Sequence, residues 1–259
     1  MAEPKRTGPR ILVTNDDGIH AEGIRVLERV AARMSDDVWV VAPEVNNSGA
    51  AHSLTLRRPL RVRRVAERRF AVDGTPTDCV LLALQNIIRD APIDLVLSGV
   101  NHGGNLAEDV TYSGTVAAAM EATLFKVPAV AFSQVCRNTE PTRWATAEHW
   151  APDLVRRFTA MSWPEDVFIN VNFPNREAHE VKGVLVTAQG KRKLGDDLVE
   201  RIDPRGEPYV WIGALREESL HREGTDLAAV HDGFVSVTPV HMDLTHHASF
   251  GALRELLGC

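Results

Sequence analysis

The stretch RILVTNDDGIHAEG, residues Arg10–Gly23, places two adjacent carboxylates directly after a run of apolar residues. Such a short run of Ile, Leu and Val is typical of a strand buried on both faces of a parallel sheet. Like charges as close as Asp16 and Asp17 repel by about 4 kcal/mol at about 4 Å and an effective dielectric constant of about 20. A divalent cation between the two carboxylates would turn this repulsion into attraction. The alternative is that Asp16 forms an Asx turn and Asp17 caps a helix.

Similar apolar runs follow along the first half of the chain, separated by patterns with helical spacing. Buried strands are expected at Arg10–Thr14, Asp37–Ala42, Asp94–Ser98 and Pro128–Phe132. Helices are expected at Gly23–Met34, Asp78–Ile88 and Thr115–Phe125. Strands that alternate with helices predict an α/β fold, in which helices cover both faces of a parallel sheet.

The second half of the chain is less regular. The run Arg57–Phe70 is expected as an inserted extended ribbon, Thr142–Thr159 as a helix, and Asp166–Pro174 and Gly233–Thr245 as strands. The stretch Lys182–Asp226 has β-rich ends around a polar centre with Gly and Pro, which predicts a β-rich extension, a hairpin arm. We therefore expect a disordered tail over residues 1–9, a Rossmann-like α/β domain over 10–180 and a C-terminal extension over 181–259.

Composition excludes several classes of protein. The 259 residues are 44% hydrophobic and 25% charged, as in ordinary globular proteins, and no apolar run reaches the roughly 20 residues of a membrane span. A formal net charge of -6 argues against a nucleic-acid coat protein. The three cysteines, Cys79, Cys136 and Cys259, form no CxxC pair, so we expect neither a disulfide framework nor a thiolate zinc site. A reducing cytoplasm is the simplest location.

Polar residues follow each expected strand where ligands bind in open parallel sheets, beyond the carboxyl ends of the strands. NDDG follows the first strand, NNSG with Ser48 follows the second, and SGVN with Asn101 follows the third. Mg²⁺ and Mn²⁺ prefer carboxylate, carbonyl and water oxygens. Oxygen-bearing side chains in three such loops therefore predict a site for a hard divalent cation.

A second polar motif, YSGTVAAAMEA from Tyr112 to Ala122, opens a strong helical pattern. Helix amino termini bind phosphate through unpaired N–H groups and the positive end of the helix dipole. The alternative is simple N-capping by Ser113 or Thr115. DGTPTDCV has the same two interpretations, with Thr75 as the N-cap. The Walker and GxGxxG fingerprints are absent.

Other candidates have weaker support. The arginine-rich ribbon is expected to be a solvated face, although it could also steer polyanionic substrates. HMDLTHH fits no zinc signature, so its histidines are expected to be structural or exposed. His20 and His102 flank the acidic pair, and both proton transfer and a plain loop position stay open. GxSxG and HExxH are absent, so serine-hydrolase and zincin chemistry are unsupported.

Taken together, the motifs resemble the survival protein SurE family of metal-dependent nucleoside-monophosphate phosphatases. The matching stretches are LVTNDDGIHAEGI, VVAPEVNNSGAAHSLT, DGTPTDCV, DLVLSGVNHGGN, DVTYSGTVAAAMEA and GTDLAAVHDGFVSVTP. They occur in the family's order and span nearly the whole chain. One departure is Ala107, where the family pattern has glycine.

The resemblance implies a Rossmann-like three-layer parallel sheet core with a C-terminal hairpin arm. It implies one divalent ion per subunit, Mg²⁺ or Mn²⁺, and Asp16 and Asp17 as catalytic residues. The implied metal ligands are Asp16, Asp17, Ser48 and Asn101, and the implied phosphate contacts are Asn105, Ser113, Gly114 and Thr115. It also implies a homodimer or homotetramer formed through the arm. We expect a cytoplasmic protein with no membrane partner and no stable nucleic-acid complex.

The resemblance further implies hydrolysis of nucleoside 5′-monophosphates to nucleoside and phosphate, while action on 3′-monophosphates and short polyphosphate stays open. The general base is also open between Asp17 and a metal-bound hydroxide. The main alternative is a receiver-like Mg²⁺-binding phosphoacceptor, but that class needs an Asp at the end of the third strand, where this chain has Ser98 and Gly99. A haloacid-dehalogenase-type phosphatase needs a DxD motif, which NDDG does not provide.

Overall fold

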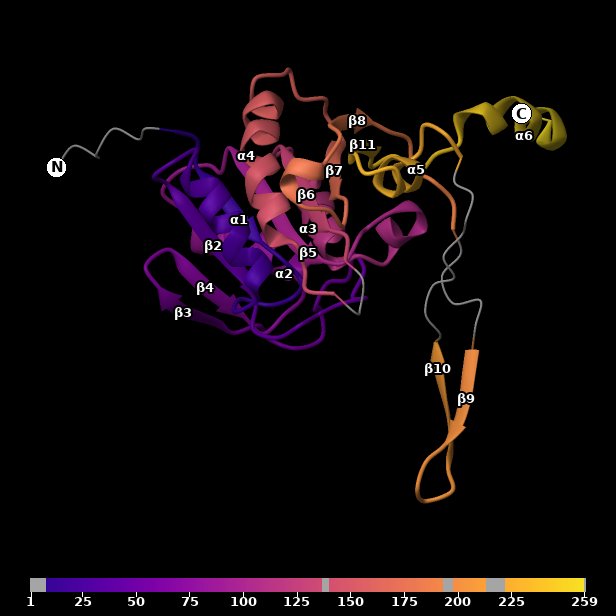
Figure 1. Ribbon diagram of the computed structural model, residues 1–259, viewed down its shortest axis with the longest axis horizontal. Coiled ribbons are helices and arrows are strands. Elements are labelled where there is room, and N and C mark those ends of the chain that lie inside the picture. The colour runs from indigo at the N-terminus through magenta and orange to yellow at the C-terminus, as the bar shows by residue number, and fades with distance from the viewer. Residues whose placement is uncertain (1–7, 137–139, 193–197, 213–221, 259) are drawn as a thin grey trace.

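The computed structural model describes residues 8–136, 140–192, 198–212 and 222–258, so most of the expected tail lies outside the described residues. The strands of the central sheet are β1 (Ile11–Thr14), β2 (Val38–Pro43), β3 (Val62–Ala66), β4 (Arg69–Val72), β5 (Leu95–His102), β6 (Ala129–Gln134), β7 (Val167–Phe173), β8 (Val184–Val186) and β11 (Val235–His241). Within the described residues they form one nine-stranded sheet in the order β3-β4-β2-β1-β5-β6-β7-β11-β8 (Figure 1).

Helices cover both faces of this sheet. They are α1 (Glu22–Ala32), α2 (Pro76–Leu82), α3 (Gly114–Leu124), α4 (Trp144–Thr159), α5 (Asp226–His231) and α6 (Phe250–Leu257). Short π or 3-10 turns lie at Ala83–Ile87, Ala107–Thr111, Ala178–Glu180 and His247–Ser249. The residues of α1 and α4 share one buried cluster with the sheet, and those of α2 and α3 share another on the opposite face. The predicted three-layer α/β core is confirmed.

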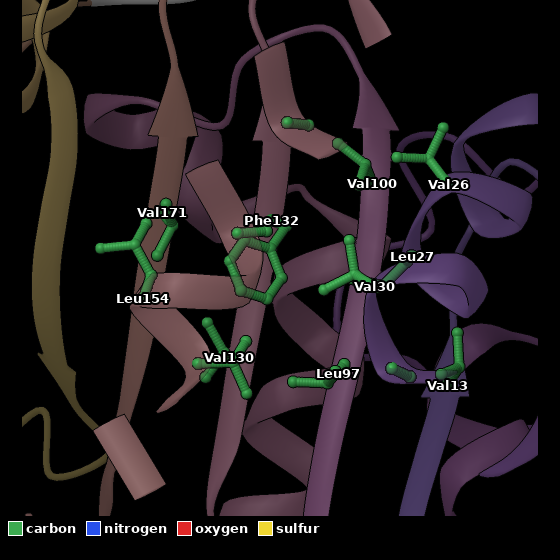
Figure 2. Packing of buried hydrophobic residues seen from close by; sticks show 14 of the residues in the cluster. Val13, Val26, Leu27, Val30, Leu97, Val100, Val130, Phe132, Leu154 and Val171 are labelled. Carbon is green, nitrogen blue, oxygen red and sulfur yellow. The ribbon is translucent and has the colours of Figure 1, made fainter. Parts of the chain in front are cut away.

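The α1/α4 side of the core is built from β-branched and aromatic side chains of the central strands. Figure 2 shows Leu97 from β5, Val130 and Phe132 from β6 and Val171 from β7 lying toward side chains of the covering helices. Leu97, Val130, Phe132 and Val171 have no exposed surface. Burying such side chains stabilises the fold by about 1.5–3 kcal/mol each. This packing fixes the strand ends that carry the polar loops.

The sheet is not parallel throughout. Parallel pairing holds from β4 through β2, β1, β5 and β6 to β7, as predicted. However, β3 runs antiparallel to β4, and β11 runs antiparallel to β7. The predicted ribbon over Arg57–Phe70 is therefore the edge hairpin of the main sheet. Apolar runs identify buried strands but do not specify the direction in which a late strand returns, so the antiparallel pairing of β11 with β7 could not be predicted.

Several element boundaries differ from expectation. The helix expected at Asp78–Ile88 begins at Pro76, because Thr75 caps it and Asp78 completes a reciprocal capping box. The third buried strand extends beyond Ser98 to His102. Ser113 caps α3, as one of the alternatives held. The N-cap of α1 is Ala21, which has no side-chain cap, so the helix-cap interpretation of Asp17 is wrong.

The expected hairpin arm is confirmed. Among the described strands, β9 (Leu198–Ile202) and β10 (Pro208–Ile212) pair only with each other, and the pair projects away from the body (Figure 1). The domain boundary at residue 180 stays a prediction. Cys79 and Cys136 are free thiols, and Cys259 lies outside the described residues. None of the described helices is long and apolar enough to cross a membrane.

Candidate active site

Asp16 lies where β1, the loop after β2 and the start of α3 meet. Its side chain accepts a short hydrogen bond from the Thr115 hydroxyl, and its carbonyl oxygen accepts one from the Asn47 N–H at 2.8 Å. Gly114 packs against it so closely that an added Cβ would lie 2.7 Å from the Asp16 Cβ. Asp16 is only 3% exposed. Two residues of the predicted phosphate motif therefore contact the first predicted metal ligand.

Asp17 follows β1, and its side chain contacts the end of β5. Its Oδ2 accepts a hydrogen bond from the His102 N–H at 3.0 Å. The register of β5 against β6 shifts between Ser98 and Asn101, beside Gly99. Gly99 has φ +124°, and an added Cβ there would lie 2.2 Å from the Phe132 carbonyl oxygen, so only glycine fits. The contact with Asp17 lies just beyond this irregularity, at the end of β5.

The predicted ligands Ser48 and Asn101 have oriented polar groups. The Ser48 hydroxyl donates to Asn46 Oδ1 at 2.6 Å, which leaves lone pairs on the Ser48 oxygen. The Asn101 Nδ2 donates to the Gly103 carbonyl oxygen at 2.9 Å, which makes the amide oxygen the atom available to a ligand. The Asn47 contact with Asp16 and the His102 contact with Asp17 bring both loops to the acidic pair.

The predicted phosphate contacts lie in two parts of the structure, the start of α3 and the loop after β5. Ser113 caps α3 by accepting from the Val116 N–H at 3.1 Å, and Gly114 and Thr115 form the first turn beside Asp16. Asn105 is 6% exposed, and its Nδ2 donates to Ser133 Oγ at 2.8 Å. The Asn105 amide therefore faces β6, and its contact with a phosphate stays a prediction.

The expected departure at Ala107 has a visible structural basis. Its φ of +52° lies in the left-handed region that favours glycine. Its methyl group is fully buried in a small cluster with Leu106, Leu227 and Val230. Burial of that methyl, worth about 0.8 kcal/mol, offsets part of the left-handed strain, for which about 1–2 kcal/mol is typical.

Burial outweighs the neighbouring interactions that would keep the acidic pair charged. Burial raises the pKa of Asp16 to about 6, the neighbouring charge of Asp17 adds to the rise, and the Thr115 hydrogen bond opposes it. Burial also raises the pKa of Asp17, against the hydrogen bond from His102. Across the described ranges, no lysine or arginine pairs with either carboxylate. Carboxylates that are largely withdrawn from solvent and have no lysine or arginine partner favour the binding of a cation.

The surrounding atoms fit a hard cation. The donor set would be two carboxylates, a hydroxyl and an amide oxygen, the oxygen chemistry that Mg²⁺ and Mn²⁺ prefer. Three further buried oxygens at the same strand ends lack hydrogen-bond partners in the part of the chain that the structure describes: Thr14 Oγ1, Asn15 Oδ1 and Ser98 Oγ. Each of these oxygens keeps lone pairs that can accept from water or from a ligand.

The C-terminal histidines are exposed and contact residues close to them in sequence. No group of three or more His, Cys, Asp and Glu suited to a metal occurs among the described residues. His247 instead pairs with Asp243 at 3.1 Å, and His246 hydrogen-bonds the Ser249 hydroxyl at 2.6 Å. The expectation that these histidines are structural or exposed is confirmed.

Sequence reasoning missed the residues that anchor the Ser48 loop. His52 Nε2 lies 2.9 Å from Glu121 Oε2 on α3. Asp78 accepts from both the N–H and the hydroxyl of Thr55, at 3.0 and 2.6 Å. The acidic residue of DGTPTDCV was visible as a capping residue, but its second partner lies 23 positions away, beyond any local signal.

Sequence reasoning also missed the support of the loop after β5. Asn172 on β7 accepts from the Asn105 N–H at 2.8 Å and donates to the Asn105 carbonyl at 3.0 Å, and Asn170 Nδ2 donates to the same carbonyl at 2.8 Å. Both strand asparagines are fully buried. Alternate asparagines in the apolar run FINVNFP were the available signal, because buried amides need specific partners.

A family model described as "Survival protein SurE" matches residues 11–196. This chain belongs to the SurE family. Among its relatives, the 5'-nucleotidase SurE of Paramagnetospirillum magneticum is 59% identical over 245 residues, which covers 95% of this chain and 94% of that protein. The 5'-nucleotidase SurE of Parvibaculum lavamentivorans is 52% identical over 261 residues, covering 100% and 94% of the two chains.

A solved structure supports the same fold. The crystal structure of the SurE protein from Aquifex aeolicus matches with a TM-score of 0.85 and 42% sequence identity, over 96% of this chain and all of that one. The resemblance seen in the sequence motifs is thereby confirmed, as is the Rossmann-like α/β architecture. Membership of the SurE family implies dependence on a divalent metal.

Proposed function

We propose that this SurE protein is a 5′-nucleotidase, which hydrolyses nucleoside 5′-monophosphates to nucleoside and phosphate with one Mg²⁺ or Mn²⁺ ion per subunit. The observation that carries the proposal is the contact of three loops at a pair of adjacent carboxylates, Asp16 buried and Asp17 half-buried, with no lysine or arginine partner among the described residues. The relatives named 5'-nucleotidase SurE, which match over almost their full length, supply the reaction class.

Asp16, Asp17, Ser48 and Asn101 are the residues that would hold the ion. When bound, such an ion polarises the phosphoryl oxygens and orients the attacking water. Asp16 also accepts from the Thr115 hydroxyl, so its carboxylate is held in place by α3. Asp17 is held by the His102 N–H from the end of β5. Contacts from α3 and from the end of β5 therefore fix the acidic pair before substrate binds.

The first turn of α3 would bind the phosphate group of the substrate. Backbone N–H groups of Gly114 and Thr115 and the positive end of the helix dipole favour a phosphate dianion. Donors fixed before the reaction stabilise the charge of the phosphoryl oxygens in the transition state without reorganisation. Asn105 would contribute a further donor from the loop after β5.

Phosphate release from a panel of substrates tests the proposal. The panel comprises nucleoside 5′- and 3′-monophosphates and short polyphosphate, each with Mg²⁺, Mn²⁺ or chelator. We expect metal-dependent release from the 5′-monophosphates, and loss of at least a hundred-fold in Asp16→Asn, because removing a preorganised charged group costs about 10²–10³-fold. A folded Asp16→Asn protein with normal turnover would remove the acidic pair from the mechanism.

We also infer that the hairpin arm joins subunits into a homodimer or homotetramer. Three of its apolar side chains are largely exposed: Ile202 at 72%, Trp211 at 63% and Ile212 at 75%. A projecting hairpin with such side chains is marginally stable alone and favours burial against another chain. The free thiols Cys79 and Cys136 agree with a reducing, cytoplasmic location.

A further inference from the structure

The loop between β5 and α3 is held by a carboxylate from the C-terminal part of the chain. Asp226, at the start of α5, has no exposed surface. Its Oδ2 accepts a hydrogen bond from the Ala107 N–H at 2.8 Å. Its Oδ1 accepts from the N–H groups of Gly190 and Leu227, each at 2.8 Å. One buried side chain thus connects three segments that are far apart in sequence.

The three backbone donors stabilise this buried charge. A buried carboxylate without partners is costly, whereas hydrogen bonds from N–H groups to an ionised oxygen are about twice as strong as neutral ones. An added Cβ at Gly190 would lie 2.8 Å from Asp226 Oδ1, so the backbone of this segment approaches the carboxylate as closely as only glycine permits. The hydrogen bonds to Asp226 therefore depend on this close approach of the Gly190 backbone.

Neighbouring residues reinforce the same connection. Gln189 Nε2 donates to the Ala107 carbonyl at 2.9 Å, and the Arg192 guanidinium pairs with the Asp109 carboxylate. The two chain segments that lead into the arm also bind each other, because Ala188 donates to the Gly224 carbonyl at 2.9 Å. The base of the arm and the loop after β5 consequently form one hydrogen-bonded unit.

This loop carries candidate site residues at both ends. Asn105 lies two positions before Ala107, and the turn Ala107–Thr111 leads directly to Ser113 and the first turn of α3. Displacement of Ala107 would therefore shift Asn105 relative to the start of α3, which its own contact with Asp16 holds in place. In contrast, Asp16 and Asp17 are positioned by other contacts.

We propose that Asp226 is a positioning residue for phosphate binding, which acts through Ala107 and connects the phosphate loop to the base of the hairpin arm. This inference rests on the proposed nucleotidase function. Asp226 itself touches no reacting atom. Its effect is to hold Asn105 and the start of α3 at the separation that a phosphate group requires.

Asp226→Asn removes the effect with little change in shape. An asparagine has one acceptor oxygen, which would stay with the two donors Gly190 and Leu227. Its NH₂ group would then face the Ala107 N–H, so two donors would oppose each other and the loop would be released. Asp203→Asn is the matched control, because Asp203 Oδ1 also accepts from two backbone N–H groups, at 2.8 and 2.9 Å, but within the exposed turn of the arm.

The test measures KM for a nucleoside 5′-monophosphate, the inhibition constant of inorganic phosphate and the dissociation constant of Mn²⁺. In Asp226→Asn we expect KM and the phosphate inhibition constant to rise about ten-fold or more, because small displacements of binding groups can cost up to about 10²-fold. The Mn²⁺ dissociation constant should stay within two-fold, and Asp203→Asn should match the wild type. A merely structural role would not separate phosphate from metal binding.

Two results would overturn the inference: unchanged phosphate constants in folded Asp226→Asn, or loss of Mn²⁺ affinity in proportion to loss of activity. If Asp226→Asn fails to fold, the Gln189→Leu variant tests the inference in its place. Gln189 is exposed, and its side chain contacts the same loop residue, Ala107. We expect it to raise the phosphate constant about three-fold, and no change contradicts the inference. If the wild type hydrolyses no nucleotide, the proposed function fails, while direct binding of inorganic phosphate still tests Asp226.

Discussion

Asp16 combines burial with contacts to two different loops, so its protonation state governs what the site can bind. The Thr115 hydroxyl and the adjacent Asp17 act on its carboxyl group in opposite directions. Burial prevails and disfavours the charged form. A metal ion and a proton therefore compete for the same oxygen atoms.

Metal affinity should depend on pH through Asp16. Because the pKa of Asp16 is raised to about 6, the carboxyl group is neutral below that pH and ionised above it. The Mn²⁺ dissociation constant should rise by about ten-fold for each pH unit below 6 and level off above it. Titration calorimetry across pH 4.5–8 checks this, with Thr115→Val expected to move the break to higher pH. A constant affinity across this range would contradict the expectation.

Gly114 is required for the approach of α3 to Asp16. In an ordinary helical position Gly→Ala stabilises by about 1 kcal/mol. Here the new Cβ would lie 3.0 Å from Asp16 Oδ2 and nearer still to its Cβ. We expect Gly114→Ala to weaken Mn²⁺ binding at least ten-fold. Gly251→Ala is the control, because no atom lies within 4 Å of its added Cβ, and it should leave binding unchanged. Equal Mn²⁺ affinity in both variants would rule out this role.

At the scale of elements, the predictions succeeded where a local pattern specifies the structure. Short apolar runs located β1, β2, β6 and β7, and Thr75 with Pro76 marked the start of α2. The loops of the candidate site could then be predicted from the strands, because the carboxyl ends of parallel strands meet at one edge of a sheet. The roles of individual residues stay predictions, and they come from the family motifs because periodicity alone does not give them.

The features that were missed depend on contacts distant in sequence. Helix α5 spans only Asp226–His231, too short for a clear periodic signal. The carboxylate of Asp226 finds its partner Ala107 at a separation of 119 positions. Asn172 and Asn105 are 67 positions apart. Such pairs become evident only when the sheet brings them together.

The packing of α1 on β5 should be sensitive to a single methyl group. Gly23 lies so near the end of β5 that an added Cβ would be 1.9 Å from the Val100 carbonyl oxygen. Overpacking of this kind typically costs about 1–3 kcal/mol. We expect Gly23→Ala to lower the free energy of unfolding by at least that amount, as measured by urea denaturation. An unchanged urea midpoint would show that the helix shifts freely.

At the scale of the whole molecule, the arm and the last helix extend away from the sheet (Figure 1). Helix α6 also exposes apolar residues, including Leu256 at 79% and Leu257 at 72%. In a single chain these apolar side chains stay largely exposed to solvent. Their burial in an oligomer would account for the exposed apolar residues of the arm and of α6.

Disrupting the arm should change the size of the particle. Ile202→Asp with Trp211→Asp places charges on the exposed apolar strands, so we expect the oligomer to dissociate at micromolar concentration. Light scattering coupled to size exclusion measures the mass. Leu124→Asp is the control, since Leu124 is 56% exposed at the end of α3 and away from the arm. A wild-type mass in the arm variant would exclude the arm as the assembly element.

The most direct measurement is an anomalous difference map from a crystal grown with Mn²⁺. We predict one strong peak per subunit, within coordination distance of oxygen atoms from Asp16, Asp17, Ser48 and Asn101. That result would show three loops sharing one ion. A fully active crystalline protein with no peak among these residues, or with Ser48 and Asn101 remote from the ion, would contradict the account.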